Sequence, residues 1–156
     1  MKKLNQVMIV DDDEVSNLFC KIVIDHADFA DNVHSCMSGA EAFDYLLESI
    51  NSNLPVPDLI LLDCSIPDMD CYEFLERYHR FGFTRMLNTR ICLLSCSVPA
   101  TDVKAALEYK GVIDYIVKPL SEEALNRLMY KLETPLLRRK LVRGFVYRSH
   151  RLGNRL

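Results

Sequence analysis

Leu59-Ile60-Leu61-Leu62-Asp63, with Pro57 before it and Pro67 after it, is the stretch of sequence that decides the fold. Four consecutive aliphatic residues are typical of a short strand buried on both faces, as in a parallel sheet covered by helices. Pro67 biases the residue before it away from helical dihedral angles, so the chain should leave this strand as a loop. Asp63 is therefore expected at the carboxyl end of a central strand, the edge at which open α/β sheets bind ligands.

Four other short apolar runs predict strands, and helical spacing follows each of the five. The additional strands are expected at 7–10, 33–36, 91–94 and 113–117. The helices are expected to begin near Glu14, at Ser38-Gly39, near Glu73, after a Thr101-Asp102 cap and at Ser121-Glu122-Glu123. The third should end near Phe81, with a loop from Gly82 to the next strand. Five strands alternating strictly with five helices predict an α/β domain whose parallel sheet has helices on both faces.

The apolar residues of the first two helices are expected to face the core. In the first helix they recur at i, i+3, i+4, i+7 and i+8, which predicts a single buried face. This face consists of Val15, Leu18, Phe19, Ile22 and Val23, and the inner side of the second helix consists of Ala42, Phe43, Leu46, Leu47 and Ile50.

Charge divides the chain into an acidic body and a basic end. At 156 residues, with 49% hydrophobic residues, the chain is long enough for one domain with a real core. From Leu132 onward there are seven Lys and Arg residues against Glu133 alone, a charge of +6, which leaves −9 for the rest. An acidic body argues against nucleic-acid binding by the domain itself. We expect a domain over 1–132 and a basic amphipathic helical tail over 133–156 that is not an independent domain.

The cysteines indicate reduced thiols rather than a metal or disulfide framework. None of the six forms a Cys-x-x-Cys pair, and no His lies at zinc-finger spacing from them. His26, His34, His79 and His150 are interpreted as surface or core residues. With no signal-peptide pattern and no apolar run of about 20 residues, the sequence predicts a cytoplasmic protein outside the membrane.

Polar residues follow four of the predicted strands, and together they define a chemistry. Asp11, Asp12 and Asp63 should converge at one edge of the sheet, where each pair of carboxylates repels by about 4 kcal/mol at a near-surface dielectric. Such a cluster either raises its pKa values or binds a cation, and oxygen ligands favour Mg²⁺. Lys118 adds a positive charge and Ser95 a hydroxyl donor. This set suits phosphoryl transfer to a carboxylate, giving an aspartyl phosphate.

On these residues the chain resembles a response regulator receiver domain of the two-component systems, and more narrowly the single-domain, chemotaxis-regulator-like members. The resemblance extends from about Gln6 to Leu132. It rests on Asp11-Asp12, Asp63, Pro67, Met69, Ser95, Tyr115 and Lys118-Pro119, in that order and at the expected strand ends. The resemblance implies a flavodoxin-like, doubly wound sheet of order 2-1-3-4-5 with a C-terminal helical extension.

The resemblance also implies a phosphorelay function. Asp63 would accept a phosphoryl group from a phosphohistidine of a sensor histidine kinase or a phosphotransfer protein. Asp11, Asp12 and Asp63 would hold Mg²⁺ together with the backbone carbonyl of Ser65. Such a protein is a signalling switch, and not an enzyme beyond its own phosphoryl transfer and autodephosphorylation.

Three further residues have roles implied by the same resemblance. Lys118 would neutralise a phosphoryl oxygen, and Ser95 would move to hydrogen-bond another. Tyr115 would follow Ser95 from an outward to an inward rotamer and so alter a partner-binding face. The expected partners are an unidentified downstream protein and, as an open option, a second copy of the chain, with no DNA-binding domain and no membrane.

The sequence departs from the receiver pattern at two cysteines. Cys71 stands where the pattern expects Gly, and a side chain disfavours left-handed dihedral angles there, so the loop before the third helix is expected to differ. Cys96 stands where Ala or Gly is usual. Asp13 and Asp68 are interpreted as solvated loop acids.

Two other functions compete with the phosphoacceptor hypothesis. One is a receiver-like module that binds partners without phosphorylation, which Cys71 supports and the complete set of acidic, Ser and Lys residues opposes. The other is a haloacid-dehalogenase-type phosphatase with Asp11 as the nucleophile, because Asp11-x-Asp13-x-Val15 fits that motif. That family needs a late acidic pair, and here only Glu122-Glu123 follows the lysine, on a helix.

Overall fold

The fold is a five-stranded, all-parallel sheet in a computed structural model that describes residues 3–96 and 100–134. The strands are β1 (Leu4–Val10), β2 (Ala30–Cys36), β3 (Leu59–Asp63), β4 (Arg90–Ser95) and β5 (Val112–Val117). Their order across the sheet is β2-β1-β3-β4-β5. The predicted order and parallel direction are confirmed, and each strand is longer than predicted by one to three residues.

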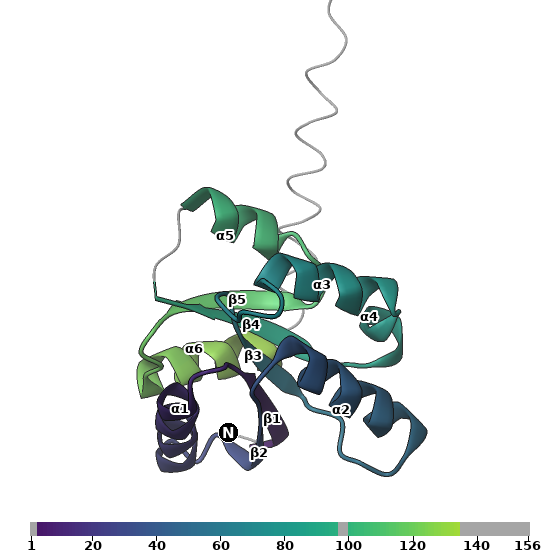
Figure 1. Ribbon diagram of the computed structural model, residues 1–156. Helices are drawn as coiled ribbons and strands as arrows, with labels where there is room; N and C mark the ends of the chain where they lie inside the picture. Colours follow the sequence, from purple (N-terminus) through teal and green to yellow (C-terminus); the bar gives the residue numbers. More distant parts are fainter. Residues whose placement is uncertain (1–2, 97–99, 135–156) are drawn as a thin grey trace, which may run out of the picture.

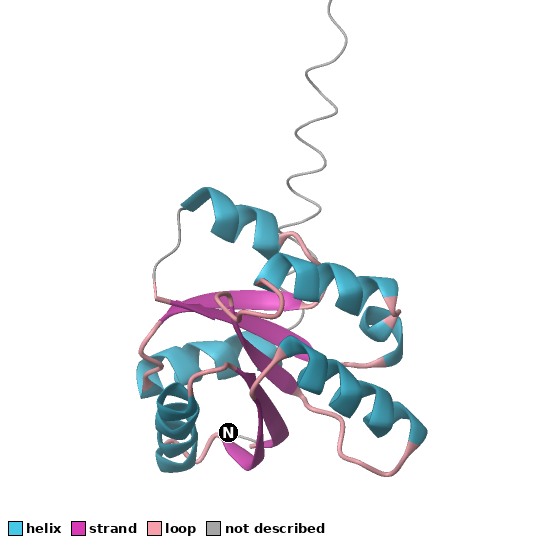
Figure 2. Ribbon diagram, viewed as in Figure 1, coloured by secondary structure: helices cyan, strands magenta, loops and turns pink. Residues whose placement is uncertain are grey.

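Helices cover both faces of this sheet (Figures 1 and 2). They are α1 (Glu14–His26), α2 (Gly39–Asn51), α3 (Cys71–Arg80), α4 (Phe83–Met86), α5 (Ala100–Leu107) and α6 (Glu122–Glu133). α1 and α6 lie on one face, and α2, α3 and α5 lie on the other. Ser121 caps α6 as predicted, because its side chain accepts a hydrogen bond from Ala124 N–H.

The sheet divides the core into two layers, and strand β1 contributes side chains to both. All of its residues from Val7 to Val10 are fully buried, as expected for a central strand with no solvent face. Val7 and Ile9 point into the layer beneath α1 and α6, whereas Met8 and Val10 point into the layer beneath α2 and α3. Side chains alternate along a strand, so one apolar run serves both layers.

Helix α1 does not bury the face that its spacing predicts. Val15, Leu18, Phe19 and Ile22 are exposed, with 75%, 59%, 44% and 57% of their surface accessible, and Val23 is half-buried. The buried residues of this helix are Asn17, Cys20 and Ile24. The prediction was wrong because i, i+3, i+4 spacing identifies an apolar face and not what covers it. We call the exposed residues Val15, Leu18, Phe19 and Ile22 the α1 stripe.

Two smaller expectations also need correction. In α2, Ala42, Phe43 and Leu46 are buried as predicted, but Leu47 and Ile50 are exposed. The segment after Gly82 holds the short helix α4 where a loop was expected. It begins after Gly82 in the left-handed conformation, with φ of 81°, which only glycine adopts easily.

Two further expectations concern the segment around 100 and the C-terminal tail. Helix α5 begins at Ala100, so Thr101 and Asp102 lie inside it rather than at its cap. The predicted tail helix falls within 135–156, outside the described residues. Among the helices that the structure describes, none has both the length and the apolar composition needed to cross a membrane.

We predict that two isoleucines two residues apart in α1 differ sharply in their contribution to stability. Ile24 is fully buried and Ile22 is mostly exposed. Ile24→Ala should lower the free energy of unfolding by about 2–5 kcal/mol, because it leaves a cavity. Ile22→Ala should change it by no more than about 0.5 kcal/mol. Urea unfolding followed by circular dichroism measures both, and equal costs would contradict an exposed stripe.

Candidate phosphoacceptor site

The carboxyl ends of β1 and β3 bring three carboxylates together. Val10 pairs with Leu62 in the parallel register, so the residues that follow them, Asp11 and Asp63, leave the sheet side by side. Side-chain oxygens of Asp11, Asp12 and Asp63 all lie within 4.8 Å of one another. Asp11 and Asp63 are buried and Asp12 is exposed. The cluster predicted from three strand-end acids is therefore present.

Lys118, at the end of β5, bridges the two buried carboxylates. Its Nζ donates to Asp11 Oδ2 at 2.6 Å and to Asp63 Oδ2 at 3.0 Å. The exposed fractions of the three side chains are only 16% for Lys118, 1% for Asp11 and 8% for Asp63. Water screens such a buried pair little, so this cation offsets most of the repulsion between the two acids. The Lys118–Pro119 peptide bond is cis.

Burial and hydrogen bonding act in opposite directions on the charged groups. Burial would raise the pKa of Asp11, but hydrogen bonds from Lys118, Ser16 and Asp13 N–H outweigh it and hold this pKa below the usual 3.8. Burial would lower the pKa of Lys118, but its bonds to Asp11 and Asp63 raise it above 10.5. The stabilisation from ionised Asp11 is therefore present above pH 3.8 and lost as the pH falls through its lower folded-state pKa.

Two residues of α1 that we had not singled out fix the position of Asp11. Ser16 Oγ donates to Asp11 Oδ2 at 2.6 Å, and Asn17 Nδ2 donates to the Asp11 backbone oxygen at 2.7 Å. Asp13 is not simply solvated, because its carboxylate caps α1 by accepting from Val15 N–H and Ser16 N–H. The signal for this cap was in the sequence, since Asp is a preferred N-cap residue before a helix.

The loop after β3 ties the phosphoacceptor candidate to α2. Asp63 Oδ1 accepts a hydrogen bond from Ser65 N–H at 3.1 Å. Asp68, expected to be solvated, instead accepts from Gly39 N–H at 3.1 Å and Ala40 N–H at 3.0 Å at the start of α2. A carboxylate is stabilised there because those backbone donors have no partner within the helix.

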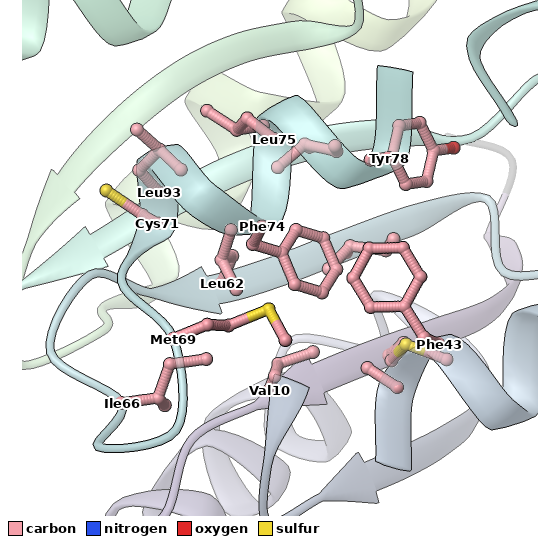
Figure 3. Packing of buried hydrophobic residues seen from close by; sticks show 14 of the residues in the cluster. Val10, Phe43, Leu62, Ile66, Met69, Cys71, Phe74, Leu75, Tyr78 and Leu93 are labelled. Atoms are coloured by element: carbon pink, nitrogen blue, oxygen red, sulfur yellow. The ribbon is translucent and has the colours of Figure 1, made fainter. Parts of the chain in front are cut away.

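Met69 anchors the same loop in the core (Figure 3). Its side chain is buried in the layer that contains Val10, Phe43 and Phe74. A Cβ atom on Gly39 would lie only 2.6 Å from Met69 Cγ and Sδ. Glycine at this position therefore lets the loop pack directly against the start of α2.

Ser95 and Tyr115 lie on the strands next to the acids. Ser95 is buried at the end of β4, and its backbone oxygen accepts from Lys118 N–H at 2.9 Å. The Tyr115 hydroxyl is shielded from solvent and has no hydrogen-bond partner within 3–96 and 100–134. The switch role expected of Tyr115 stays a prediction.

The cysteines around the site behave differently from one another. Cys71 begins α3 after the Asp70 cap, and the only non-glycine residue with positive φ in the described part is Asp28. The expected change in the loop therefore takes the form of an ordinary helix start, with the Cys71 side chain buried. Cys64 and Cys71 are in thiol contact, while Cys96 is exposed.

The donor set fits Mg²⁺. The formal charges of Asp11, Asp12 and Asp63 sum to −3, and Lys118 contributes +1. A divalent cation would balance the net charge of −2. All three side chains offer oxygen, the ligand that this ion prefers, and Asp12 is open to water, which Mg²⁺ usually retains in part. Ser65 is exposed beside Asp63, where its backbone carbonyl was expected to act as a ligand.

Comparison with known proteins identifies the family. The family model for the response regulator receiver domain matches residues 7–130 of the chain. The chain belongs to the receiver domain family. Transcriptional regulatory protein CitT of Halalkalibacterium halodurans is 34% identical over 128 residues, which are 81% of this chain and 51% of CitT. The signal transduction histidine-protein kinase BarA of Shigella flexneri is 26% identical over 134 residues, which are 83% of this chain and 13% of BarA.

The architecture of this receiver domain has a solved counterpart. A two-component response regulator from Cytophaga hutchinsonii superimposes with a TM-score of 0.78 and 26% sequence identity, covering 85% of this chain and 99% of that one. The predicted family and fold are confirmed. The chain spans about half of CitT and a small part of BarA, so these relatives share with it a domain and not a whole protein.

We predict that Lys118→Met destabilises the receiver domain when Mg²⁺ is absent. The change leaves Asp11 and Asp63 buried without their cation, which should lower the free energy of unfolding by about 3 kcal/mol. Mg²⁺ should then raise the melting temperature of the variant more than that of the wild type, because the ion replaces the missing charge. Thermal melts with and without Mg²⁺ measure this, and equal shifts would contradict binding at these carboxylates. Lys131→Met, which removes an exposed lysine paired with Asp114, is the matched control.

Proposed function

We propose that this receiver domain is a phosphorylation switch whose phosphoacceptor is Asp63. The supporting observation is the buried, Lys118-bridged pair of Asp11 and Asp63 at the carboxyl edge of a parallel sheet. Asp63 is the residue of this pair on the central strand β3, and it is less completely buried than Asp11, with 6% of its surface accessible against 0%. On this proposal the protein catalyses only its own phosphorylation and dephosphorylation.

The proposed step transfers a phosphoryl group from a phosphohistidine of a sensor kinase or a phosphotransfer protein. A carboxylate oxygen of Asp63 forms a bond to phosphorus while the bond from phosphorus to the imidazole nitrogen breaks, and the nitrogen keeps the electron pair. The bonds from Ser65 N–H and Lys118 Nζ hold one carboxylate oxygen each, so they fix the rotation of the carboxylate before attack. Positioning of this kind supplies most of the catalysis in phosphoryl transfer.

We propose that the neighbouring residues stabilise the negative charge that the phosphoryl group adds to the site. Mg²⁺ held by Asp11, Asp12, Asp63 and the Ser65 carbonyl would supply electrostatic stabilisation of the phosphoryl oxygens. Lys118 can exchange its bond to Asp63 for one to a phosphoryl oxygen, and Ser95 can donate its hydroxyl to another. We assign the switch to Tyr115, whose hydroxyl is buried without a hydrogen-bond partner among the described residues.

The α1 stripe is the surface we assign to the phosphodonor. Val15, Leu18, Phe19 and Ile22 form a contiguous apolar face on the helix that begins three residues after Asp11. Such a face beside the site favours a helical partner with a complementary apolar surface over a small soluble donor alone. We propose a cytoplasmic sensor kinase or phosphotransfer protein as that partner.

Family membership removes the support for the phosphatase hypothesis. In the structure Asp13, which that motif needs as an acid, is the cap of α1. The phosphorylation-independent module remains the alternative outcome of the experiment below.

We predict that Asp63→Asn abolishes phosphorylation. The full chain, incubated with Mg²⁺ and a small acyl phosphate, should gain the mass of one phosphoryl group, and hydroxylamine should remove it. The variant should gain none, because an amide is no nucleophile for phosphorus. Asp68→Asn is the matched control, since this acid lies on the same loop but accepts from Gly39 N–H and Ala40 N–H at the start of α2. A folded wild type that accepts no phosphoryl group from either an acyl phosphate or a histidine donor would favour the binding module.

We predict that the α1 stripe controls transfer from a protein donor only. Leu18→Ser and Ile22→Ser should slow transfer from a phosphorylated kinase or phosphotransfer protein by about tenfold or more, as expected for contacts at the centre of an interface. The rate with a small acyl phosphate should not change, because neither side chain touches the acidic site. Met86→Ser, at an exposed apolar residue of α4, is the control. Unchanged transfer from the protein donor would place its docking surface elsewhere.

A further inference from the structure

A second group of metal-binding side chains lies between β2 and α2, apart from the carboxylate cluster. His34, Cys36 and Glu41 each offer one ligand atom, and these three atoms lie within 4.8 Å of one another. His34 and Cys36 are two residues apart on β2, so both point to the face that α2 covers. Glu41 lies above them in the first turn of α2. The group combines nitrogen, sulfur and oxygen donors.

The imidazole of His34 is held in place by ring stacking and makes no hydrogen bond within the described residues. Its ring stacks on Tyr45 of α2, with centroids 4.2 Å apart and planes 27° from parallel. Tyr45 is itself fixed, because its hydroxyl donates to the Pro55 backbone oxygen and accepts from Gln6 Nε2. Within the described part of the chain nothing hydrogen-bonds to the His34 ring. A half-buried imidazole that is positioned by stacking keeps its nitrogens for another ligand.

Glu41 is turned toward the end of β2 by a capping interaction. Ser38 caps α2 and accepts from Glu41 N–H at 3.1 Å, while Glu41 Oε2 accepts from Met37 N–H at 2.7 Å. This reciprocal arrangement is a capping box in which the acid reaches back past the cap residue. It accounts for one carboxylate oxygen. The cap leaves the carboxylate close to the other two residues, since one of its oxygens lies within 4.8 Å of ligand atoms of His34 and Cys36.

Cys36 supplies the inner side of the group. It is completely buried at the end of β2, in the layer that also contains Val10 and Ala42. Its backbone oxygen accepts from Asp11 N–H at 3.1 Å, so this strand end is bonded directly to the strand end that carries the acidic cluster. The two groups share that backbone bond but no side chain.

We propose that His34, Cys36 and Glu41 form a site for a thiophilic divalent cation of the Zn²⁺ class. Three protein ligands of mixed N, S and O type with one position left for water match the open tetrahedral sites of zinc. Closing the ligand atoms by about 1 Å would bring them to the separations that tetrahedral Zn²⁺ requires. On binding, the Cys36 thiol loses its proton to solvent as the bond from sulfur to the metal forms. Mg²⁺ would not compete, since it favours oxygen ligands alone.

The spacing of these three residues in the sequence does not indicate a metal site. His-x-Cys followed by an acid five residues later matches none of the familiar zinc patterns, and His34 was interpreted as a surface or core residue. The strand places the first two ligands on one face, and the turn into α2 folds the third over them. Only the tertiary structure brings the three side chains together.

We predict that Co²⁺, used as a spectroscopic probe for Zn²⁺, binds the full-length protein through Cys36. In excess Mg²⁺ and a phosphine reductant, one equivalent of Co²⁺ should produce a thiolate-to-cobalt charge-transfer band in the near ultraviolet, and Zn²⁺ should remove it. Cys36→Ser should abolish the band. His34→Gln and Glu41→Gln, at less buried positions, should each weaken binding by about tenfold or more.

Controls separate this site from the other thiols and from the acidic cluster. Cys20→Ser changes a buried thiol in the opposite layer, and Asp12→Asn changes the carboxylate group; both should leave the band unchanged. Circular dichroism checks that each variant is folded. The proposal is overturned if the wild type shows no band, or if the band survives both His34→Gln and Glu41→Gln. It is also overturned if the band survives Cys36→Ser and disappears in Cys71→Ser, which would place the metal on the Cys64–Cys71 thiol pair.

Discussion

The ammonium group of Lys118 is the interaction on which the site depends. Without it, Asp11 and Asp63 would stand side by side in a buried position with nothing to offset their repulsion. With it, both acids have a cationic partner at the edge of the sheet, and the pKa of Asp11 stays low in spite of burial. Because Lys118 closes β5 and the acids close β1 and β3, one set of contacts joins three of the five strands.

The loop after β3 extends this arrangement to the neighbouring helix. Asp63 is bonded to Ser65, and a few residues later Asp68 and Met69 are fixed to the start of α2 by backbone hydrogen bonds and by packing on Gly39. The short loop that follows Asp63 is therefore anchored at both ends. This is a physical basis for a switch, since a ligand biases a segment only through contacts that differ between its states.

The two faces of α1 have different roles: the inward face stabilises the domain, and we propose that the outward face binds a partner. Asn17 and Ile24 face inward, where one holds Asp11 by its backbone and the other fills the core. The apolar stripe faces outward, next to the acidic cluster. A helix of this kind carries more apolar surface than its own domain covers, and it adjoins the acidic cluster that we propose as the phosphoacceptor site.

The sequence by itself determined the order of the strands and of every helix among the described residues except α4, the parallel sheet, the family and the acids that meet at the sheet edge. It could do so because a short all-apolar run that ends in a polar residue is typical of a buried parallel strand. The carboxyl ends of parallel strands lie at the same edge of the sheet, so the polar residues meet there. Tertiary structure alone decided which side of α1 is covered, that Asp68 caps α2, and that His34, Cys36 and Glu41 meet. Periodicity shows that residues share a face, but burial and contact depend on which elements pack against that face.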